Sequence, residues 1–335
     1  MALFSKELGI DLGTSRIRIA EAGECRLDEP TIVAVAVEEQ KIVEVGQAAQ
    51  NMLGRVPDTI EVIRPLQNGV VAYYEITENL LASMMKKVGG SMRFFRPRLM
   101  VTIPYGITSV ETRAVHEAAL GAGSHEAYLI HQPLAAAIGA DLPISTPSGN
   151  MVVSLGGGCS QAAVIAMNTI VVADIIRTGG KELDDAITSY VRKKYGLIIG
   201  QPTAEQIKIQ IGAAVPQDEE RTMEIQGQDQ VSGLPKPLTL STAEIVEAIH
   251  DRLRAIIEMV RRVLEKTPPE LVSDTIDRGI ALCGGGALLR GIDKLMTKEL
   301  GIPTYFVDHP TTVIAEGASR AMEILPTLMR SLPRV

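Results

Sequence analysis

The chain has 335 residues, of which 46% are hydrophobic and 22% are charged, and its formal net charge is −7. This length predicts at least two domains, the composition excludes a disordered chain, and the acidic charge disfavours nucleic acid as a general partner. The three cysteines are too few and too scattered for a disulfide framework or a zinc site, and the lack of a signal peptide or a continuous apolar span predicts a cytoplasmic protein without a transmembrane helix.

The first half of the chain alternates short apolar runs with helical patterns. Strands are predicted at 7–11, 16–20, 99–103 and 128–130, and helices at 109–122 and from Pro133 onward. In the second strand, Ile17 and Ile19 alternate with Arg16 and Arg18, which is the period of a half-buried strand. In the helix at 109–122, Val110 and Val115 are expected on one apolar face.

The second half contains a possible repeat of the first. Strands are predicted at 151–155, 162–167, 170–176, 221–226, 238–241 and 280–282, and helices at 181–195, 204–213, 243–266 and 287–296. A strand, a small-residue turn and a second strand occur at 8–20 and again at 152–167. This weak repeat predicts two similar α/β halves with a ligand in the cleft between them.

Three glycine-containing turns each follow a buried strand: GIDLGTS at 9–15, VVSLGGGCS at 152–160 and ALCGGGALLRG at 281–291. Glycine lets backbone N–H groups approach phosphate oxygens because no Cβ blocks them, and Thr14, Ser15 and Ser160 would add hydroxyl donors. A single turn of this kind is as often an ordinary loop, but three together favour a nucleotide. Neither GxxxxGK[ST] nor GxGxxG occurs, which excludes a P-loop enzyme and argues against a Rossmann dehydrogenase.

Along nearly its whole length the chain resembles the bacterial actins of the MreB family, within the actin and heat-shock-chaperone ATPase superfamily. The matching segments are GIDLGT, MLGRVP, IRPLQNGVVA, VTIPYGIT, QPLAAAIGA, GGKELDDAI, AEQIKIQIGAA, CGGGALLRGID and AEGASRAM. The resemblance implies an actin-like (ribonuclease H-like) duplicated α/β fold, with two lobes of two subdomains around a nucleotide cleft. The implied subdomains are 1–32 with 66–145 and 312–335 (IA), 33–65 (IB), 146–180 with 243–311 (IIA) and 181–242 (IIB).

The resemblance also implies the residues that bind ATP or ADP and Mg²⁺. The implied set is Asp11, Gly13, Thr14 and Ser15 in the first phosphate loop, Gly156, Gly157, Gly158, Cys159 and Ser160 in the second, Glu205 and Lys208 at the ribose and adenine, and Gly284, Gly285 and Gly286 behind the adenosine. Asp11 would hold Mg²⁺ through water, and Asp11 and Gln132 would be the catalytic residues.

As partners, the resemblance implies further copies of the chain in filaments, commonly antiparallel doublets. Such filaments lie on the inner face of the cytoplasmic membrane, and they guide cell-wall elongation proteins in rod-shaped bacteria.

The chain departs from the family's pattern at positions that bear on chemistry. Ser154 stands where the second phosphate loop usually begins with an aspartate that helps to hold the hydrated Mg²⁺. Gln132 replaces the glutamate that orients or deprotonates the attacking water, and glutamine positions water but is no base. His131 beside it is expected to be structural rather than catalytic. Arg16 is expected at the surface, with a position near phosphate as the alternative. We therefore expect ATP binding and polymerisation with slow hydrolysis.

Two other functions remain open within the same superfamily. A sugar kinase needs a carboxylate base near the second loop, where Ser154 stands. A chaperone ATPase carries a substrate-binding domain after the ATPase, and we expect none after Val335.

Two short segments suggest contact with a membrane. Met92, Phe94 and Phe95 lie between cationic residues in GGSMRFFRPR, and Phe4 lies in MALFSKE. Apolar side chains flanked by cations suit the headgroup boundary of an anionic leaflet, and the equivalent loop of the resembled family inserts into membranes. The alternative is that Phe94 and Phe95 pack into the core.

Overall fold

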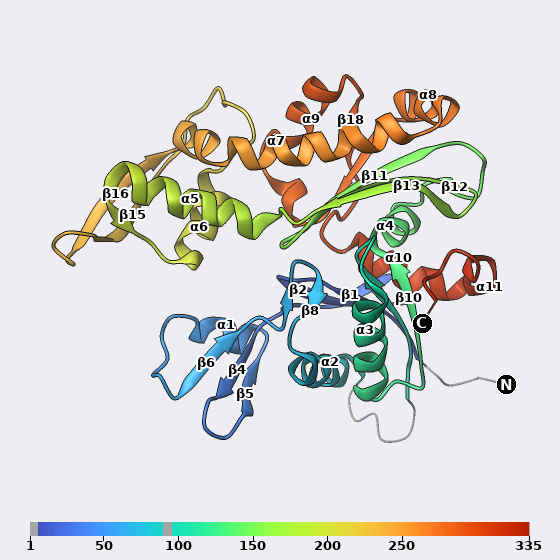
Figure 1. Cartoon of the computed structure of the whole chain (residues 1–335), viewed down its shortest axis with the longest axis horizontal. Coiled ribbons are helices and arrows are strands. Elements are labelled where there is room, and N and C mark those ends of the chain that lie inside the picture. The colour runs from blue at the N-terminus through green and yellow to red at the C-terminus, as the bar shows by residue number, and fades with distance from the viewer. Residues whose placement is uncertain (1–5, 90–95, 335) are drawn as a thin grey trace.

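The computed structural model describes residues 6–89 and 96–334. The membrane-contact predictions at Phe4, Met92, Phe94 and Phe95 therefore lie outside the described residues. Within the described part, the chain forms two lobes stacked on each other (Figure 1). We call the lobe that contains the N-terminal sheet lobe I and the other lobe II.

Lobe I is built around a five-stranded sheet with the strand order β10-β9-β1-β2-β3. Its strands are β1 (Glu7–Leu12), β2 (Arg16–Glu21), β3 (Glu24–Pro30), β9 (Arg98–Ile103) and β10 (Glu126–His131). β1 pairs antiparallel with β2 and parallel with β9, and β9 pairs parallel with β10. The two predicted strands around the first glycine turn are thus confirmed as a hairpin at the centre of this sheet.

Lobe II is built around a second five-stranded sheet, with the order β13-β12-β11-β17-β18. Its strands are β11 (Asn150–Leu155), β12 (Ser160–Ala166), β13 (Thr169–Ile176), β17 (Ile280–Cys283) and β18 (Thr304–Phe306). β11 pairs antiparallel with β12 and parallel with β17, and β17 pairs parallel with β18. The chain order and the strand directions repeat those of lobe I, so the predicted duplication is confirmed.

Smaller sheets and helices surround these two sheets. Small sheets are formed by β4 (Val33–Ala36), β5 (Lys41–Val45) and β6 (Ile60–Ile63), by β7 (Leu66–Gln67) and β8 (Val70–Val71), and by β14 (Leu197–Ile198), β15 (Thr222–Asp229) and β16 (Pro235–Ser241). The helices are α1 (Gln47–Met52), α2 (Tyr74–Gly89), α3 (Ser109–Gly121), α4 (Gln132–Gly139), α5 (Gly180–Tyr195), α6 (Gln201–Ile211), α7 (Thr242–Lys266), α8 (Pro269–Arg278), the 3-10 helix η1 (Gly285–Leu288), α9 (Ile292–Leu300), α10 (Val313–Glu323) and α11 (Leu325–Leu328).

Two helices, α4 and α10, cross between the sheets at glycines. A Cβ added at Gly317 would lie 1.8 Å from the carbonyl oxygen of Ala135, and one added at Gly139 would lie 2.0 Å from that of Val313. The two backbones therefore touch, which only glycine permits. One buried cluster also contains residues from both sheets, including Ile130 of lobe I and strands β11, β12 and β17 of lobe II. The lobes thus share a core beneath the cleft.

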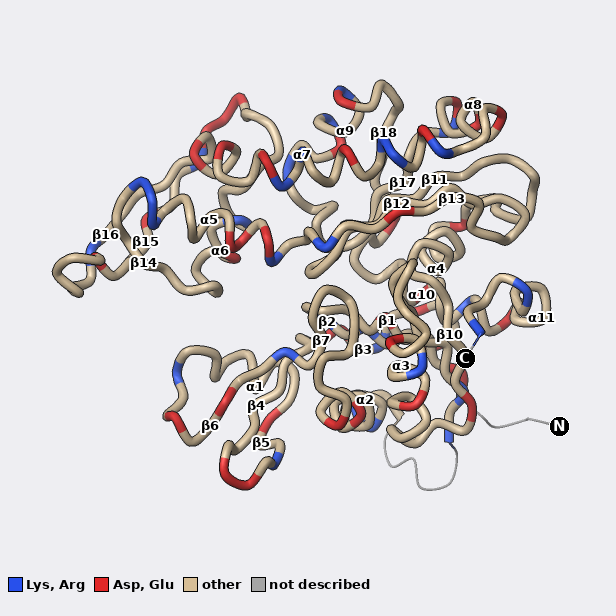
Figure 2. Tube along the Cα trace, viewed as in Figure 1, with Lys and Arg blue, Asp and Glu red and all other residues tan. Residues whose placement is uncertain are grey.

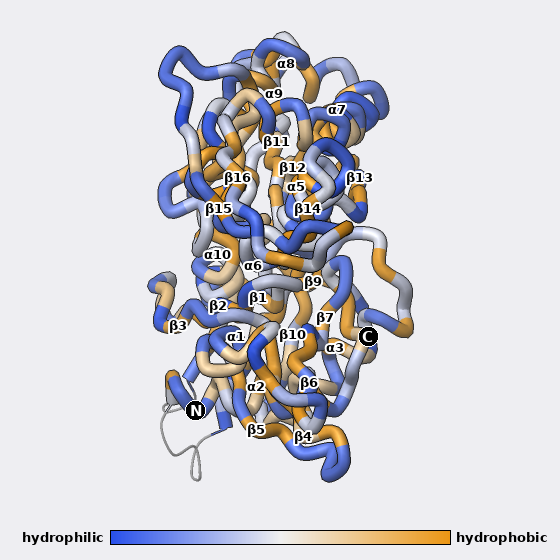
Figure 3. The backbone as a smooth tube through the Cα atoms, turned by 90° about the vertical axis from the view of Figure 1, so that its left-hand side faces the viewer, coloured by the Kyte–Doolittle hydropathy of each residue, from blue (hydrophilic) through white to orange (hydrophobic). Residues whose placement is uncertain are grey.

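The hydrophobic residues follow this architecture. Apolar segments gather in the two central sheets, while the outer loops are largely hydrophilic (Figure 3). Acidic and basic residues are spread over the outer elements of both lobes (Figure 2). None of the helices in the described ranges is long and apolar enough to span a bilayer.

Three details of the sequence-based predictions were wrong. β2 is not half-buried, because it lies inside the sheet with α10 packed against it, and Arg18 is only 8% exposed. The helix predicted from 287 does not begin there, because Gly291 has a left-handed φ of 72° and separates η1 from α9. Val110 is 76% exposed, since α3 buries the face that contains Val115.

Candidate functional site

A cleft of about 410 Å³ lies between the lobes and brings most of the predicted residues together. The predicted residues that line it are Asp11, Gly13, Thr14, Ser15, Gln132, Gly156, Gly157, Gly158, Cys159, Glu205, Lys208, Gly284, Gly285 and Gly286. Ser160 does not line it, because its hydroxyl is buried and donates to the carbonyl oxygen of Thr178 at 2.8 Å. All three glycine turns therefore meet in one cavity.

The first two turns have the same backbone geometry. Gly13 N donates to the carbonyl oxygen of Arg16 at 3.1 Å, and Gly156 N donates to that of Cys159 at 2.9 Å. A Cβ added at Gly13 would lie 2.7 Å from the carbonyl oxygen of Arg16, and one added at Gly156 would lie 2.7 Å from that of Cys159. Each turn is thus closed by one hydrogen bond between residues three apart, and glycine is required at the matched position in both.

The two turns also touch each other across the cleft. A Cβ at Gly157 would lie 2.1 Å from Ser15 Oγ, and one at Gly158 would lie 2.6 Å from Thr14 Oγ1. Thr14 is held in place by Gly69 N, which donates to its Oγ1 at 2.7 Å. The hydroxyls of one lobe therefore face the bare backbone of the other, an arrangement suited to surrounding phosphate oxygens from both sides.

Asp11 lies at the end of β1 and is only 5% exposed. Its Oδ1 accepts hydrogen bonds from Thr102 Oγ1 at 2.9 Å and from Gln132 Nε2 at 3.3 Å, and its Oδ2 lies 3.8 Å from Arg18 Nη1. Burial raises the pKa of Asp11, while the Arg18 guanidinium and the two hydrogen bonds act in the opposite direction.

Gln132 links the two lobes through a chain of amides. Gln161 Nε2 on β12 donates to Gln132 Oε1 at 2.5 Å, and Tyr105 N of lobe I donates to Gln161 Oε1 at 2.7 Å. Both glutamines are buried. Gln132 therefore lies beside Asp11 at the cleft, with its carbonyl oxygen engaged by Gln161.

The lobe II turn has no charge at its matched positions. The register pairs Asp11 with Arg18 in lobe I and Ser154 with Gln161 in lobe II. Ser154 is buried and lines the cleft beside Cys283. Asp11 therefore carries the only carboxylate among the described residues of these two turns and of the strand positions paired with Asp11 and Ser154.

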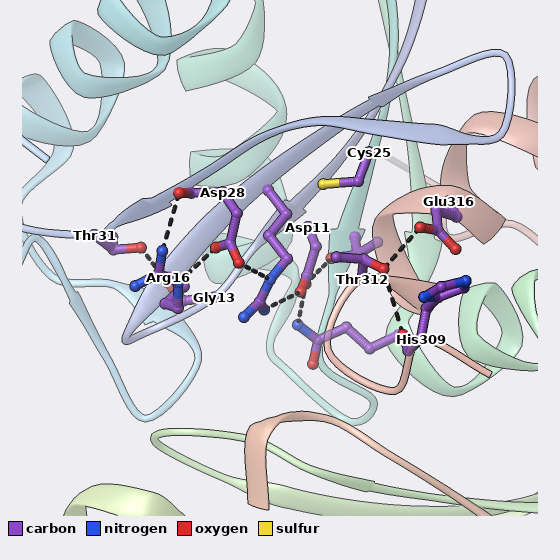
Figure 4. Close-up of polar contacts among 12 residues, drawn as sticks. Asp11, Gly13, Arg16, Cys25, Asp28, Thr31, His309, Thr312 and Glu316 are labelled. Carbon is purple, nitrogen blue, oxygen red and sulfur yellow. Dashed lines mark hydrogen bonds and ion pairs between the residues drawn. The ribbon is translucent and has the colours of Figure 1, made fainter. Parts of the chain in front are cut away.

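Two arginines of β2 lie close to the first turn, and both contact Asp28 of β3. Arg16 Nε donates to Asp28 Oδ1, and Arg18 Nε lies 3.2 Å from Asp28 Oδ2. Figure 4 shows Asp28 between Arg16 and Asp11. The Arg16 side chain is 39% exposed and that of Arg18 is 10% exposed. Arg16 therefore lies at the rim with its charge paired, whereas Arg18 is inside the cleft wall.

At the α5 and α6 wall of the cleft, Lys208 Nζ donates to the carbonyl oxygen of Gly180 at 2.8 Å. It also lies 2.8 Å from Asp184 Oδ1, as an ion pair that lacks hydrogen-bond geometry. Burial raises the pKa of Asp184 to about 6, although Lys208 acts to lower it. Arg64 of lobe I lines the same cleft, and its Nη1 is buried without a hydrogen-bond partner.

The third turn presents its backbone to the cleft. Gly284 has a φ of 85°, and a Cβ there would lie 2.4 Å from the carbonyl oxygen of Leu155. No atom lies within 4 Å of a Cβ placed at Gly285, so this position faces open space. The turn is thus packed against β11 on one side and open on the other, as a surface for a flat ring requires.

His131 has the structural position that we expected. Its ring packs edge-on against Tyr105 with 5.3 Å between centroids, and burial lowers its pKa. It is not among the residues that line the cleft.

Sequence reasoning missed five charged residues of the cleft: Arg18, Arg64, Lys181, Asp184 and Arg290. Arg18 was predicted to face solvent because it alternates with isoleucines. The signal that would have found it is its register, since a hairpin closed at Gly13 places Arg18 directly opposite Asp11. Arg64 and Asp184 lie in segments that carry the family resemblance, but no spacing in the sequence marks them as neighbours.

Comparisons with known proteins agree with this geometry. The sequence model of the family described as MreB/Mbl protein matches residues 5–330. The cell shape-determining protein MreB of Escherichia coli strain K12 is 44% identical over 330 residues, which cover 96% of this chain and 95% of that protein.

Solved structures give the same result. MreB5 of Spiroplasma citri bound to ADP has a TM-score of 0.91 and 32% identity, and the match covers 97% of this chain and 98% of that one. The same protein has also been solved bound to AMPPNP. The MamK double helical filament has a TM-score of 0.81 at 20% identity, covers 96% of this chain and 99% of that one, and shares the fold. The chain belongs to the MreB/Mbl family, whose fold is that of the actins.

Proposed function

We propose that this chain is an actin-like cytoskeletal protein that binds ATP and ADP in the cleft, polymerises into filaments and determines cell shape. The observation that carries the nucleotide part is the pair of matched glycine turns that face each other across the cleft, with the hydroxyls of Thr14 and Ser15 against Gly157 and Gly158. The solved structures of Spiroplasma citri MreB5 with ADP and with AMPPNP support the same ligand.

The polymerisation and shape-determining parts of the proposal rest on the relatives. The curated relative from Escherichia coli is named a cell shape-determining protein, and MamK, which shares the fold, forms a double helical filament. By extension we propose antiparallel double filaments at the inner face of the cytoplasmic membrane, where they organise cell-wall elongation proteins. The four subdomain boundaries implied by the resemblance stay part of this proposal.

Hydrolysis is proposed to be slow, so that the ATPase acts as a timer on the filament. Gln132 lies beside Asp11 with its carbonyl oxygen occupied by Gln161, and an amide is not a general base. Asp11 is itself buried against Arg18. Gln132 therefore cannot remove a proton from an attacking water, which is the role of the family's glutamate at this position.

The magnesium ion that accompanies the nucleotide in the resembled family fits these residues poorly. Magnesium binds through carboxylates and phosphates, but the turns offer only Asp11, and Arg18 already faces it. Ser154 supplies a neutral hydroxyl on the other side. Among the described residues, no group of three His, Cys, Asp or Glu side chains is arranged to hold a metal. Asp11 remains the candidate for contact through water.

The test of the proposed function is negative-stain electron microscopy of the purified chain with ATP, ADP, AMPPNP and no nucleotide, beside an equilibrium ADP titration. Double filaments and saturable ADP binding are expected. Absence of both in every condition would overturn the proposal, and ATP consumption that depends on an added sugar would favour a kinase instead.

The membrane part has its own test, co-sedimentation with anionic vesicles. We expect a Phe94→Ser/Phe95→Ser variant to pellet less than the wild type, because its apolar side chains no longer enter the headgroup region. Phe306→Ser is the matched control, since Phe306 is exposed on β18, away from that segment in sequence. Equal pelleting of the double variant and the control would contradict this role.

A further inference from the structure

Arg18 combines burial, charge and a position at the cleft, and its ion pairs with Asp11 and Asp28 are not hydrogen bonds of good geometry. It lies on β2, opposite Asp11, and is 8% exposed. A buried guanidinium is costly unless its N–H groups are paired. Here Nε is buried and has no hydrogen-bond partner, although Asp28 Oδ2 lies 3.2 Å away. The nearest contact to Asp11 is 3.8 Å, beyond hydrogen-bond distance.

The position of Arg18 is also that of a ligand contact. It lines the cleft together with Gly13, Thr14, Gly156 and Gly157, the backbone that faces the proposed phosphates. A guanidinium has five donors in a planar fork that matches a phosphate group. An anion at these turns would therefore be contacted by the terminal nitrogens of Arg18, because Nε is buried beside Asp28.

The charge balance of the two turns leads to the same conclusion. The matched positions hold Asp11 and Arg18 in one lobe and Ser154 and Gln161 in the other. These four side chains sum to zero, and the neighbouring Asp28 carboxylate is offset by Arg16, so the turns carry no net negative charge with which to attract a divalent cation. A fixed cation is instead already present where Asp11 would contact a hydrated ion.

We propose that Arg18 supplies to the phosphates the positive charge that a hydrated magnesium ion would otherwise bring to Asp11, so that this chain binds ADP and ATP with little dependence on Mg²⁺. The inference rests on the proposed nucleotide site and specifies how that site neutralises its ligand. In this arrangement Asp11 positions Arg18, and the guanidinium contacts the phosphates.

The experiment is an ADP titration of the full chain by calorimetry, with Mg²⁺ and with excess EDTA. We expect the wild-type Kd to change by less than about threefold between the two conditions. Arg18→Gln, which gives lobe I the residue of lobe II, is expected to weaken ADP binding in EDTA by about ten- to a hundredfold, the range for a lost charged hydrogen bond, and to recover part of it with Mg²⁺. Arg26→Gln, which removes an exposed charge on β3, is the matched control and stays within about twofold of wild type.

Arg18→Gln leaves Asp11 without its cation, so a second variant guards against loss of folding. Asp11→Asn/Arg18→Gln is neutral at both positions, like the pair in lobe II. If Arg18 contacts phosphate, this variant binds ADP in EDTA about tenfold more weakly than wild type. If Arg18 serves only to neutralise Asp11, it binds as tightly as wild type, and the inference is overturned.

The two proposals fail in distinguishable ways. Wild-type binding that weakens more than about tenfold in EDTA overturns the role of Arg18 and leaves the nucleotide site in place. No ADP binding by the wild type in either condition overturns the nucleotide site itself, and the role of Arg18 with it.

Discussion

In lobe I, Asp11 and Arg18 lie opposite each other on β1 and β2, and in lobe II the same two positions on β11 and β12 hold Ser154 and Gln161. The glycine that follows is closed by the same hydrogen bond in both lobes. A duplicated backbone therefore carries a charged pair on one side of the cleft and a neutral pair on the other. The shared backbone geometry supports nucleotide binding by both lobes, and the difference in side-chain chemistry underlies the proposal that hydrolysis is slow.

The largest expected effect comes from removing the cation of lobe I. Arg18→Gln leaves Asp11 buried without its ionic partner, which costs about 3 kcal/mol of unfolding free energy or more. Adding Asp11→Asn makes the pair neutral, as in lobe II, and is expected to recover most of this loss. Urea unfolding of both variants measures it. A loss below about 1 kcal/mol for Arg18→Gln would show that the two lobes do not differ energetically at this pair.

The same variant has a predictable pH dependence. Burial already raises the pKa of Asp11, and loss of the Arg18 guanidinium, which acts to lower it, raises it further. A carboxyl with a folded-state pKa above its unfolded value holds its proton longer in the native state, so stability falls as pH rises through the folded pKa. The deficit of Arg18→Gln relative to wild type is therefore expected to shrink in acid. A deficit that grows in acid would contradict this sign.

The matched glycines test whether the two backbones are equivalent. Gly13→Ala and Gly156→Ala each place a Cβ 2.7 Å from a carbonyl oxygen, so we expect similar losses of about 1–3 kcal/mol in unfolding free energy. Gly285→Ala is the control, because no atom lies within 4 Å of its Cβ. If the losses for Gly13→Ala and Gly156→Ala differed by more than about 1 kcal/mol, the two turns would share their backbone geometry but not their contribution to stability.

The smallest expected effect concerns Asp184, a buried carboxyl of lobe II that lines the cleft away from the glycine turn. Burial raises the pKa of Asp184 to about 6, so the native state keeps a proton that the unfolded chain releases near its ordinary value. The contribution of Asp184 to the wild-type free energy of unfolding is therefore lost as pH rises through 6. Asp184→Asn has no carboxyl at this position, so it does not show this loss. Between pH 5 and 7 the variant should gain about 1 kcal/mol relative to wild type in urea unfolding. If the difference in unfolding free energy between Asp184→Asn and wild type stayed constant over this pH range, the raised pKa of Asp184 would be contradicted.

Sequence patterns predicted the large features of this fold because those features are local. Buried runs bounded by glycine gave β1, β2, β11 and β12, and the repeat of strand, turn and strand gave the duplication. Capping explains the helix starts: α3 begins where Thr108 Oγ1 accepts from Glu111 N and Glu111 accepts from Thr108 N.

What the patterns did not predict depends on contacts between distant segments. The alternation of charged and apolar residues predicts that Arg18 faces solvent. β2 is nevertheless buried, because a strand lies on each side of it and α10 packs against it. From the sequence, Gly291 was placed inside a continuous helix. In the structure its left-handed φ separates η1 from α9. The amide chain from Tyr105 through Gln161 to Gln132 joins residues of both lobes, and no sequence spacing marks it.

The most direct test of the account is steady-state phosphate release at saturating ATP by the wild type and by Gln132→Glu. Gln132 is an amide at the position where a glutamate would accept a proton from the attacking water, so the wild type should be slow and the glutamate variant faster by about tenfold or more. Gln206→Glu, an exposed glutamine on α6, is the matched control and should release phosphate at the wild-type rate. A wild type that hydrolyses as fast as Gln132→Glu would contradict the account.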